Sequence, residues 1–155
     1  MENGSHGYLQ IGEAAERSGL TQRTLRYYEE RELLPAPSRM EGGFRLYSAE
    51  DMERVERVKE LKELLGFSLA DIKQMLDAED VRMQIRAEWR KDADAEEKAE
   101  KVRIAREVTL RQISLLDQKV EKMEKMRAQL AERLAKHDEM LRQYAEAQTT
   151  AAVRE

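Results

Sequence analysis

The chain has no cysteine, no long apolar run and, in its second half, no residue that breaks a helix. With no cysteine among 155 residues, disulfides, thiolate metal sites, iron–sulfur clusters and thiol redox sensing are excluded. No apolar run approaches the roughly 20 residues of a membrane span, and the N-terminal sequence MENGSHGYLQ has no signal-peptide apolar core. We therefore expect a cytoplasmic protein with no membrane partner.

Glycine and proline divide the chain in two. All seven glycines and both prolines lie at or before Gly66, and nothing from Phe67 to Glu155 interrupts a helix by its backbone chemistry. Aromatic residues make up 5% of the chain and charged residues 39%, which favours long solvated helices. The sequence predicts a turn-rich N-terminal half and a C-terminal half that is helical nearly throughout.

The turn-rich half contains a segment typical of a helix that enters a DNA groove. Residues 21–34, TQRTLRYYEERELL, put polar and basic side chains and two tyrosines on one helix. Upstream, IGEAAERSGL predicts a short helix and a glycine turn; downstream, Pro35 and Pro37 precede the tight hairpin GGFRLY. Helix, turn, helix and a basic, aromatic β-wing form the layout of a winged helix-turn-helix.

Capping residues predict where these helices begin. We expect a first helix over Ile11–Arg17, with Gly19 in the turn, and a second helix from its N-cap Thr21 to about Arg31. The second helix should bury Leu25 in a core with Ile11, Ala14, Ala15 and Leu20.

Two further capped helices should follow the hairpin. Ser48 is expected to cap a third helix that ends at Gly66, and Ser68 a fourth. Residues 77–101 carry Val81, Ile85 and Trp89 at helical spacing, which indicates one short amphipathic helix before a polar connection.

Net charge gives mild evidence against a nucleic-acid partner, because the chain carries −4 at pH 7 and such proteins are usually basic. A long mixed-charge segment dilutes any local field, however, and DNA contact needs only a local basic face. That face can come from Arg17, Arg23, Arg26, Arg39 and Arg45. The acidic residues between them must then point elsewhere.

A heptad pattern runs through the C-terminal half. One series recurs every seven residues and a second lies four residues after each member of the first, so together they predict a coiled-coil seam. Its two series are Val102, Thr109, Leu116, Met123, Leu130, His137 and Tyr144, and Arg106, Ile113, Val120, Arg127, Leu134 and Leu141. At roughly 1.5 Å per residue the arm spans about 65 Å, so we expect a second chain to cover it in a homodimer.

From Tyr8 to Leu76 the chain resembles the MerR family of bacterial transcription regulators. The segments YLQIGEAAERSGLTQRTLRYYEERELLPAPSR and GGFRLYSAEDMERVERVKELKELLGFSLADIKQML follow the family's N-terminal domain almost without gaps. The resemblance implies a mainly α fold: a winged helix-turn-helix, a helical linker and a long antiparallel coiled-coil dimerisation helix. It implies a homodimer on a pseudo-palindromic promoter, which distorts the DNA so that RNA polymerase can engage, and which represses when no effector is bound.

The resemblance also carries residue roles. It places Thr21, Gln22, Arg23, Arg26 and Tyr27 at the groove and its flanking phosphates, and Tyr28 in the core. Arg45 and Tyr47 of the wing would grip the backbone, and Arg17 is a further phosphate ligand. Dimerisation falls to Val102, Thr109, Ile113, Leu116, Val120, Met123, Leu130, Leu134 and Leu141.

The chain departs from the family pattern at two places. Glu32 stands where the family usually has a glycine, so we expect a looser turn or a slightly longer second helix. The cysteines of metal-sensing and redox-sensing members are absent, so no cofactor or metal is expected. An organic effector could bind at Trp89, with Phe67, Val81, Met83 and Ile85 nearby; the alternative, which we favour, is that Trp89 only packs against the partner's arm.

The domain boundaries follow from these segments. We expect a flexible N-terminus over 1–7, the DNA-binding domain over 8–77, a helical linker over 78–101, the dimerisation helix over 102–147 and a flexible tail over 148–155. No nucleophile–His–acid set or glycine-rich phosphate loop occurs, so the chain is not expected to be an enzyme. The alternatives are an effector-independent repressor and a coiled-coil interaction protein with a vestigial head.

Overall fold

The computed structural model describes residues 7–36, 38, 39 and 41–153. By their internal contacts the residues group into two units, Met1–Thr109 (unit 1) and Leu110–Glu155 (unit 2). Pro37, which was expected to precede the hairpin, and most of the expected N-terminal segment 1–7 lie outside the described residues.

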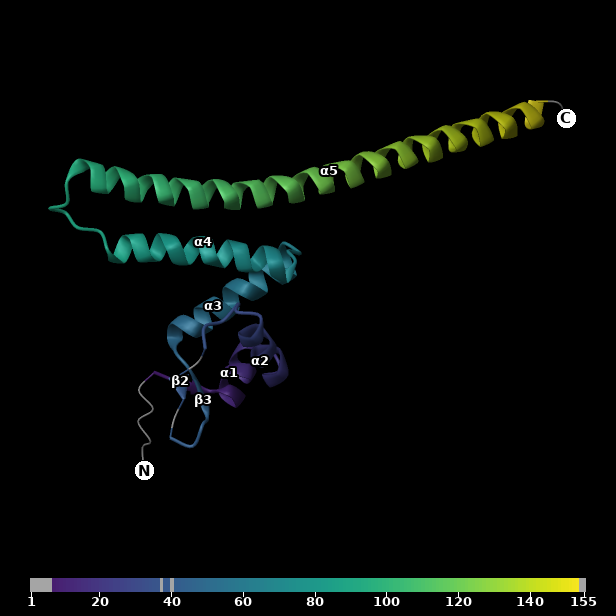
Figure 1. Ribbon diagram of the computed structural model, residues 1–155. Helices are drawn as coiled ribbons and strands as arrows, with labels where there is room; N and C mark the ends of the chain where they lie inside the picture. The colour runs from purple at the N-terminus through teal and green to yellow at the C-terminus, as the bar shows by residue number, and fades with distance from the viewer. Residues whose placement is uncertain (1–6, 37, 40, 154–155) are drawn as a thin grey trace. The chain divides into compact units, whose positions relative to one another are not determined.

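The helix-turn-helix of unit 1 forms as its capping residues predict. Helix α1 covers Ile11–Ser18 and α2 covers Gln22–Glu30 (Figure 1). Gly19 ends α1 in the left-handed conformation, with φ at 72°, which a glycine adopts without steric cost. The Thr21 hydroxyl accepts a hydrogen bond of 3.0 Å from the backbone N–H of Thr24 and so caps α2.

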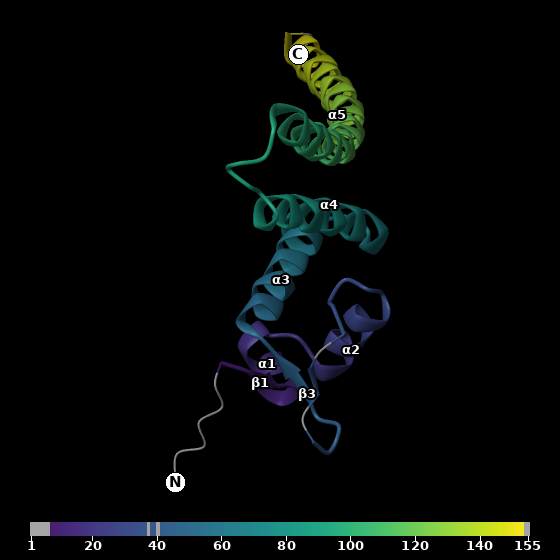
Figure 2. The same cartoon turned by 60° about the vertical axis from the view of Figure 1, so that its left-hand side comes forward.

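A small antiparallel sheet completes the winged fold (Figure 2). Its strands are β1 (Leu9–Gln10), β2 (Ser38–Arg39) and β3 (Arg45–Tyr47), in the spatial order β1-β3-β2. Leu9 pairs with Tyr47, and Arg39 pairs with Arg45. The wing is therefore the β2–β3 hairpin, and β1 joins its strand β3 to the start of α1.

Helix α3 covers Ala49–Lys59 and begins at a reciprocal cap. The backbone N–H of Ser48 donates to Asp51, and the backbone N–H of Asp51 donates to the Ser48 hydroxyl. The last turn before Gly66 differs from the prediction. It is a π-helical turn, η1 (Glu60–Leu64), closed by the bond from Leu65 N–H to the Glu60 carbonyl. Gly66, with φ at 62°, then turns the chain.

Helix α4 is one continuous helix over Leu69–Ala87, capped by Ser68 as predicted. The helix continues past residue 77 because Met75, Leu76 and Ala78 are all buried on it and no helix breaker intervenes. The short helix expected around Val81 and Ile85 is therefore the second half of α4, and the connection to the next helix shortens to residues 88–94.

Helix α5 covers Ala95–Val153, starting before and ending after the predicted dimerisation helix. Within unit 1 its first turns run back antiparallel to α4 (Figures 1 and 2). There Lys101 donates to the Glu88 carbonyl over 2.8 Å, and Val108 is buried. The expected flexible tail is helical as far as Val153, since alanine-rich sequence with no glycine or proline continues the helix.

None of the helices in the described part of the chain combines the length and the apolar character needed to cross a membrane.

The core of unit 1 lies between α2, β3, α3, η1 and α4. Leu25 and Tyr28 of α2 are buried as predicted, and so are Ala14 and Ala15 of α1, whereas Ile11 and Leu20 are only partly buried. The other large buried side chains are Leu33, Leu34, Tyr47, Met52, Val55, Val58, Leu61, Phe67, Ile72, Met75 and Leu76.

The turn after α2 contradicts the prediction made at Glu32. Glu32 takes the left-handed conformation itself, with φ at 58°. The Leu33 N–H donates to the Tyr28 carbonyl over 2.9 Å and the Glu32 N–H to the Glu29 carbonyl over 3.0 Å, which is the Schellman pattern of a helix end. The turn is neither looser nor displaced, because the surrounding hydrogen bonds hold a residue with a Cβ in a glycine conformation.

This conformation predicts that Glu32→Gly stabilises the protein. A left-handed L-residue costs roughly 1–2 kcal/mol, and the entropy that glycine adds to the unfolded chain offsets about 0.5–1 kcal/mol of the gain. The Glu32–Lys73 pair, at 3.8 Å with the glutamate side chain 79% exposed, contributes little. We expect the free energy of unfolding in urea to rise by about 0.5–1 kcal/mol. Glu32→Ala, which removes the carboxylate but keeps the Cβ, should show no such gain; equal stability of the two variants would contradict the explanation.

Candidate nucleic-acid interface

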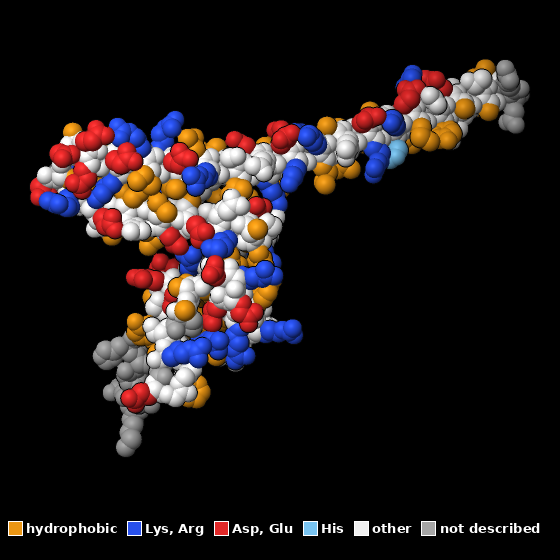
Figure 3. Space-filling model, viewed as in Figure 1, with side chains coloured by type: hydrophobic (Ala, Val, Ile, Leu, Met, Phe, Trp, Pro, Cys, Tyr) orange, Lys and Arg blue, Asp and Glu red, His pale blue; other side chains and the backbone are white. Residues whose placement is uncertain are grey.

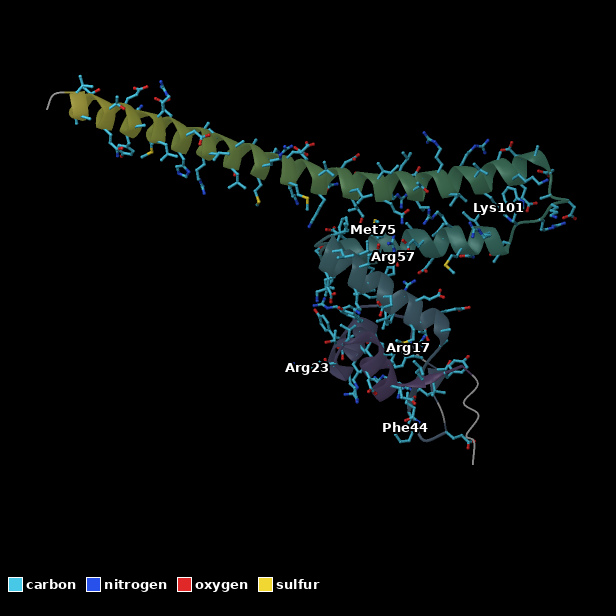
Figure 4. The ribbon with its side chains drawn as sticks, turned by 180° about the vertical axis from the view of Figure 1, so that it is seen from behind. Arg17, Arg23, Phe44, Arg57, Met75 and Lys101 are labelled. Carbon is cyan, nitrogen blue, oxygen red and sulfur yellow. The ribbon has the colours of Figure 1, made fainter. Side chains whose placement is uncertain are left out.

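Helix α2 buries one side and presents a polar, basic side to solvent. Leu25 and Tyr28 lie in the core, while Gln22, Arg23 and Arg26 are exposed. Figure 4 shows Arg23 pointing outward from the helix. The spacing of the buried pair leaves the exposed side chains on neighbouring turns of one face. Four of the predicted groove residues are thus brought together, since Tyr27, at 38% exposure, shares this face.

The flanking positions extend the basic surface beyond α2. Arg17, in the last turn of α1, is exposed, and Figure 3 shows Lys and Arg side chains gathered over the region of α1 and α2. Thr21 is exposed, but its hydroxyl already accepts from the Thr24 backbone and lies 2.8 Å from the Thr24 hydroxyl. Thr21 therefore sets the start of α2 through its cap.

The wing places its two predicted DNA ligands differently from each other. Arg45 is partly exposed, and its Nε donates to a Glu29 carboxylate oxygen over 2.9 Å. Tyr47 is only 1% exposed and donates its hydroxyl to the other Glu29 oxygen. The predicted grip of Tyr47 on the DNA backbone does not fit its placement here, because its ring fills the core and its hydroxyl is bound to Glu29.

The surroundings of Tyr47 also change its acidity. Burial, the hydrogen bond to Glu29 and the negative charge of that carboxylate all raise the pKa of Tyr47 well above its ordinary value, and nearby Arg45 and Arg26 lower it only in part. The phenol therefore stays a neutral donor, and it holds Glu29 against β3.

Several acidic residues of the winged helix-turn-helix (the head, residues 8–47) make contacts within the head or with α4, as the charge argument required. Glu13 accepts from the backbone N–H of Gln10 at the start of α1. Glu29, whose side chain is 10% exposed, is paired with Arg45, and Glu32 lies near Lys73 of α4. The charges of these three residues are in this way engaged away from the exposed basic face, whereas Glu30 is exposed beside Arg26 and Tyr27.

Two exposed features of this surface escaped the sequence analysis. Phe44, near the tip of the β2–β3 hairpin, is 63% exposed (Figure 4). Arg31 lies over the Tyr27 ring at 5.2 Å from its centroid and donates to the Tyr27 hydroxyl over 3.1 Å. The i, i+4 spacing of Tyr27 and Arg31 could have indicated the second contact, whereas Phe44 gave only the weak signal of an aromatic beside two glycines.

Arginines of α3 join the DNA-facing half of unit 1 to α4. Arg54 donates from Nε to the Leu33 carbonyl over 2.6 Å and from a terminal nitrogen to Asp80 of α4 over 2.5 Å. Arg57 donates two bonds to Glu79 of α4. These contacts connect the end of the α2 turn to α4, so α2, α3 and α4 are braced against one another.

The predicted dimerisation seam is exposed along the described part of unit 2, which is one helix. Its apolar members are between 39% and 66% exposed, namely Ile113, Leu116, Val120, Met123, Leu130, Leu134 and Leu141. In unit 1, Val102 is 55% exposed, while the Thr109 hydroxyl donates to the Ala105 carbonyl. A stripe of this length exposed on a single helix is a surface for packing, because isolated helices have little stability without it.

The residues proposed for an effector pocket are only partly brought together. Trp89 follows the C-terminal end of α4 and is 42% exposed, whereas buried Phe67 precedes the N-terminal end of the same helix. Phe67 therefore cannot form a wall beside Trp89. Met83, at 67% exposure, remains on the Trp89 half of α4.

Comparisons with known proteins agree with this geometry. The family model described as MerR HTH family regulatory protein matches residues 9–79. The HTH-type transcriptional regulator YfmP of Bacillus subtilis (strain 168) is 37% identical over 123 residues, which cover 79% of this chain and 88% of that protein. The mercuric resistance operon regulatory protein of Bacillus cereus is 40% identical over 72 residues, covering 46% of this chain and only 54% of that protein.

A solved structure shows the same fold over nearly the whole chain. The crystal structure of a protein described as a MerR family transcriptional regulator from Listeria monocytogenes superposes with a TM-score of 0.64 at 22% identity. The match covers 95% of this chain and 99% of that one. At this identity the likeness concerns the fold alone.

The buried phenol of Tyr47 predicts a loss of stability at alkaline pH. Because its pKa is raised above the ordinary 10.0, its stabilisation is complete below about pH 10 and declines above it, as the unfolded chain loses a proton that the folded chain keeps. The decline should reach about 1.4 kcal/mol per pH unit. Urea unfolding between pH 8 and 11 should show a shallower decline for Tyr47→Phe than for the parent. Tyr8→Phe, which removes an exposed phenol, should keep the parental slope; the same slope in all three proteins would refute the assignment.

Proposed function

The chain belongs to the MerR family of helix-turn-helix regulators and is a DNA-binding transcriptional regulator, not an enzyme; from this premise we propose that α2 is its recognition helix in the major groove. The observation that carries the proposal is the division of α2 into a side buried through Leu25 and Tyr28 and an exposed side with Gln22, Arg23 and Arg26. Basic and amide side chains on one exposed helix face are the groups that read base edges and phosphates.

The remaining proposed contacts are to DNA phosphates, and they come from residues beside α2 and from the wing. Tyr27 and Arg17 flank the recognition face and suit phosphate contacts, and Thr21 orients the start of the helix. Arg45 is the wing's phosphate ligand in this proposal, because it is partly exposed and its guanidinium has N–H groups beyond the one given to Glu29. Tyr47 is withdrawn from the set of DNA ligands because it is buried.

A homodimer presents two such helices. The exposed seam of α5 supports antiparallel pairing with a second copy, through Leu116, Leu130 and the other apolar residues of the seam. Two recognition helices related by a two-fold axis match a pseudo-palindromic site whose half-sites lie in successive major grooves.

The mode of regulation follows from the family resemblance. We propose that the dimer distorts promoter DNA so that RNA polymerase can engage its two promoter elements, a deformation that the protein–backbone contacts offset. Because its proposed target is promoter DNA, we also propose that the protein acts in the cytoplasm. An organic effector would bind between the Val81–Trp89 segment and the partner's arm, supported by the partial exposure of Trp89 and Met83.

Alanine substitutions test the recognition face. A duplex selected from a random library by the parent protein is the probe, with binding measured by fluorescence anisotropy. Arg23→Ala and Arg26→Ala should each weaken binding by roughly 1–3 kcal/mol where a base contact is lost, with relaxed preference at one position. Arg45→Ala should weaken all duplexes alike and flatten the salt dependence. Arg82→Ala, an exposed arginine of α4, is the control. Unchanged affinity in all three test variants would contradict the groove assignment.

Lysine substitutions test the arm. Leu116→Lys with Leu130→Lys places like charges within the seam and should give monomers by sedimentation at micromolar concentration, with poor operator binding. Gln118→Lys with Ala131→Lys adds the same number of lysines to the same helix at positions away from the seam, and should remain dimeric. A Leu116/Leu130 variant that is still dimeric would show that the interface lies elsewhere.

A further inference from the structure

Glu29 is an acidic side chain in the last turn of the proposed recognition helix α2, where it would be expected to repel DNA. Its side chain is only 10% exposed, and both of its oxygens are occupied by the wing strand β3. Arg45 Nε donates to one oxygen over 2.9 Å, and the Tyr47 hydroxyl donates to the other. The carboxylate thus joins α2 to β3, two elements that are 16 and 18 residues apart in sequence at these contacts.

We propose that Glu29 is a positioning residue for DNA binding, which holds the Arg45 guanidinium by its Nε edge and aims its terminal nitrogens at a backbone phosphate. The inference rests on the proposed function, in which Arg45 is the wing's phosphate ligand. The bond to Glu29 uses one N–H of the guanidinium and leaves the fork of the two terminal nitrogens, the part that matches a phosphate bidentately.

The strand geometry explains why one carboxylate serves both partners. Residues 45 and 47 lie two apart on β3, so their side chains point to the same face of the sheet, and that face meets α2. Tyr47 is buried in the core and donates its hydroxyl to Glu29. Arg45 lies on the same face but nearer the hairpin, and 28% of its side chain is exposed. The buried Tyr47 hydroxyl thereby holds Glu29 in place, and Glu29 in turn holds the partly exposed Arg45 guanidinium.

The proposal predicts that removing the charge of Glu29 weakens DNA binding, whereas charge repulsion alone predicts that it strengthens binding. Removing a negative charge from a DNA-facing surface should strengthen binding by lowering repulsion of the phosphates. If Glu29 positions Arg45, its removal should instead weaken binding, because the freed guanidinium must be ordered at the moment of association. A role in fold stability alone would lower the unfolding temperature without a specific link to Arg45.

The experiment is a double-mutant cycle in the full chain with Glu29→Gln, Arg45→Ala and the combined variant. Affinity is measured for the selected duplex and for an unrelated duplex between 50 and 300 mM KCl, and circular dichroism records thermal unfolding. Glu29→Gln should weaken both duplexes by about five- to tenfold and reduce the slope of log affinity against log salt by about one, as for a lost phosphate contact. In the Arg45→Ala background the same change should cause no further loss.

Two results would overturn the proposal. One is unchanged or tighter binding by Glu29→Gln, and the other is an equal loss from Glu29→Gln in the presence and absence of Arg45. Failure of the proposed function is distinct from both, since it would appear as no loss of affinity in Arg23→Ala, Arg26→Ala and Arg45→Ala.

A second variant keeps the test decisive if Glu29→Gln does not fold. Arg45→Lys retains the charge but has a single ammonium group, which cannot offer a phosphate two parallel N–H groups while a separate edge stays on Glu29. Its affinity should fall toward that of Arg45→Ala. If Arg45→Lys kept the affinity and the salt slope of the parent, DNA binding would not require Glu29 to hold the Nε edge of Arg45.

Discussion

The exposed basic face of α2, the proposed recognition helix, depends on the burial of two side chains on the opposite face, Leu25 and Tyr28. An eight- to ten-residue helix has little stability of its own in water, so α2 exists because this pair packs against the rest of the core. Full burial of two large apolar side chains contributes roughly 1.5–3 kcal/mol each, more than the N-cap at Thr21 adds. The polar face of α2 is free to serve recognition because the apolar face carries the stability.

The charge distribution on the surface of the head depends on which of its acidic side chains are bound by other groups of the head. The chain is net acidic, yet a basic face forms because Glu13 and Glu29 are bound by partners within the head. The net charge is a sum over the whole chain, whereas a phosphate responds to charges within a Debye length of about 10 Å. Residues 8–77 are themselves slightly acidic, with 11 Lys and Arg against 14 Asp and Glu, so the basic face at α2 depends on which side chains are exposed there and not on the net charge of the domain.

The sequence predicted best what local chemistry decides. Thr21, Ser48 and Ser68 cap helices because a hydroxyl can bind the free N–H groups of the next turn, whatever the rest of the chain does. Tyr47 was misplaced because its direction depends on which face of β3 meets α2, and strand periodicity alone shows only that it shares a face with Arg45. The role of Glu29 had no local signal, since both of its partners lie on another element. The turn at Glu32 was misjudged because the backbone hydrogen bonds of the Schellman turn hold a glutamate in a conformation that favours glycine.

In the proposed dimer, the exposed apolar stripe on α5 makes folding of the arm a bimolecular event. A helix whose packing surface comes only from a second copy has no fixed stability, because its folded population depends on how much protein is present. Each tenfold dilution lowers the free energy that holds the pair by about 1.4 kcal/mol. Gene dosage and rate of synthesis thereby enter the physical chemistry of the regulator: at low copy number, newly made chains remain single, with an incompletely ordered arm open to proteolysis, and the DNA site is left vacant until the concentration exceeds the dissociation constant of the dimer.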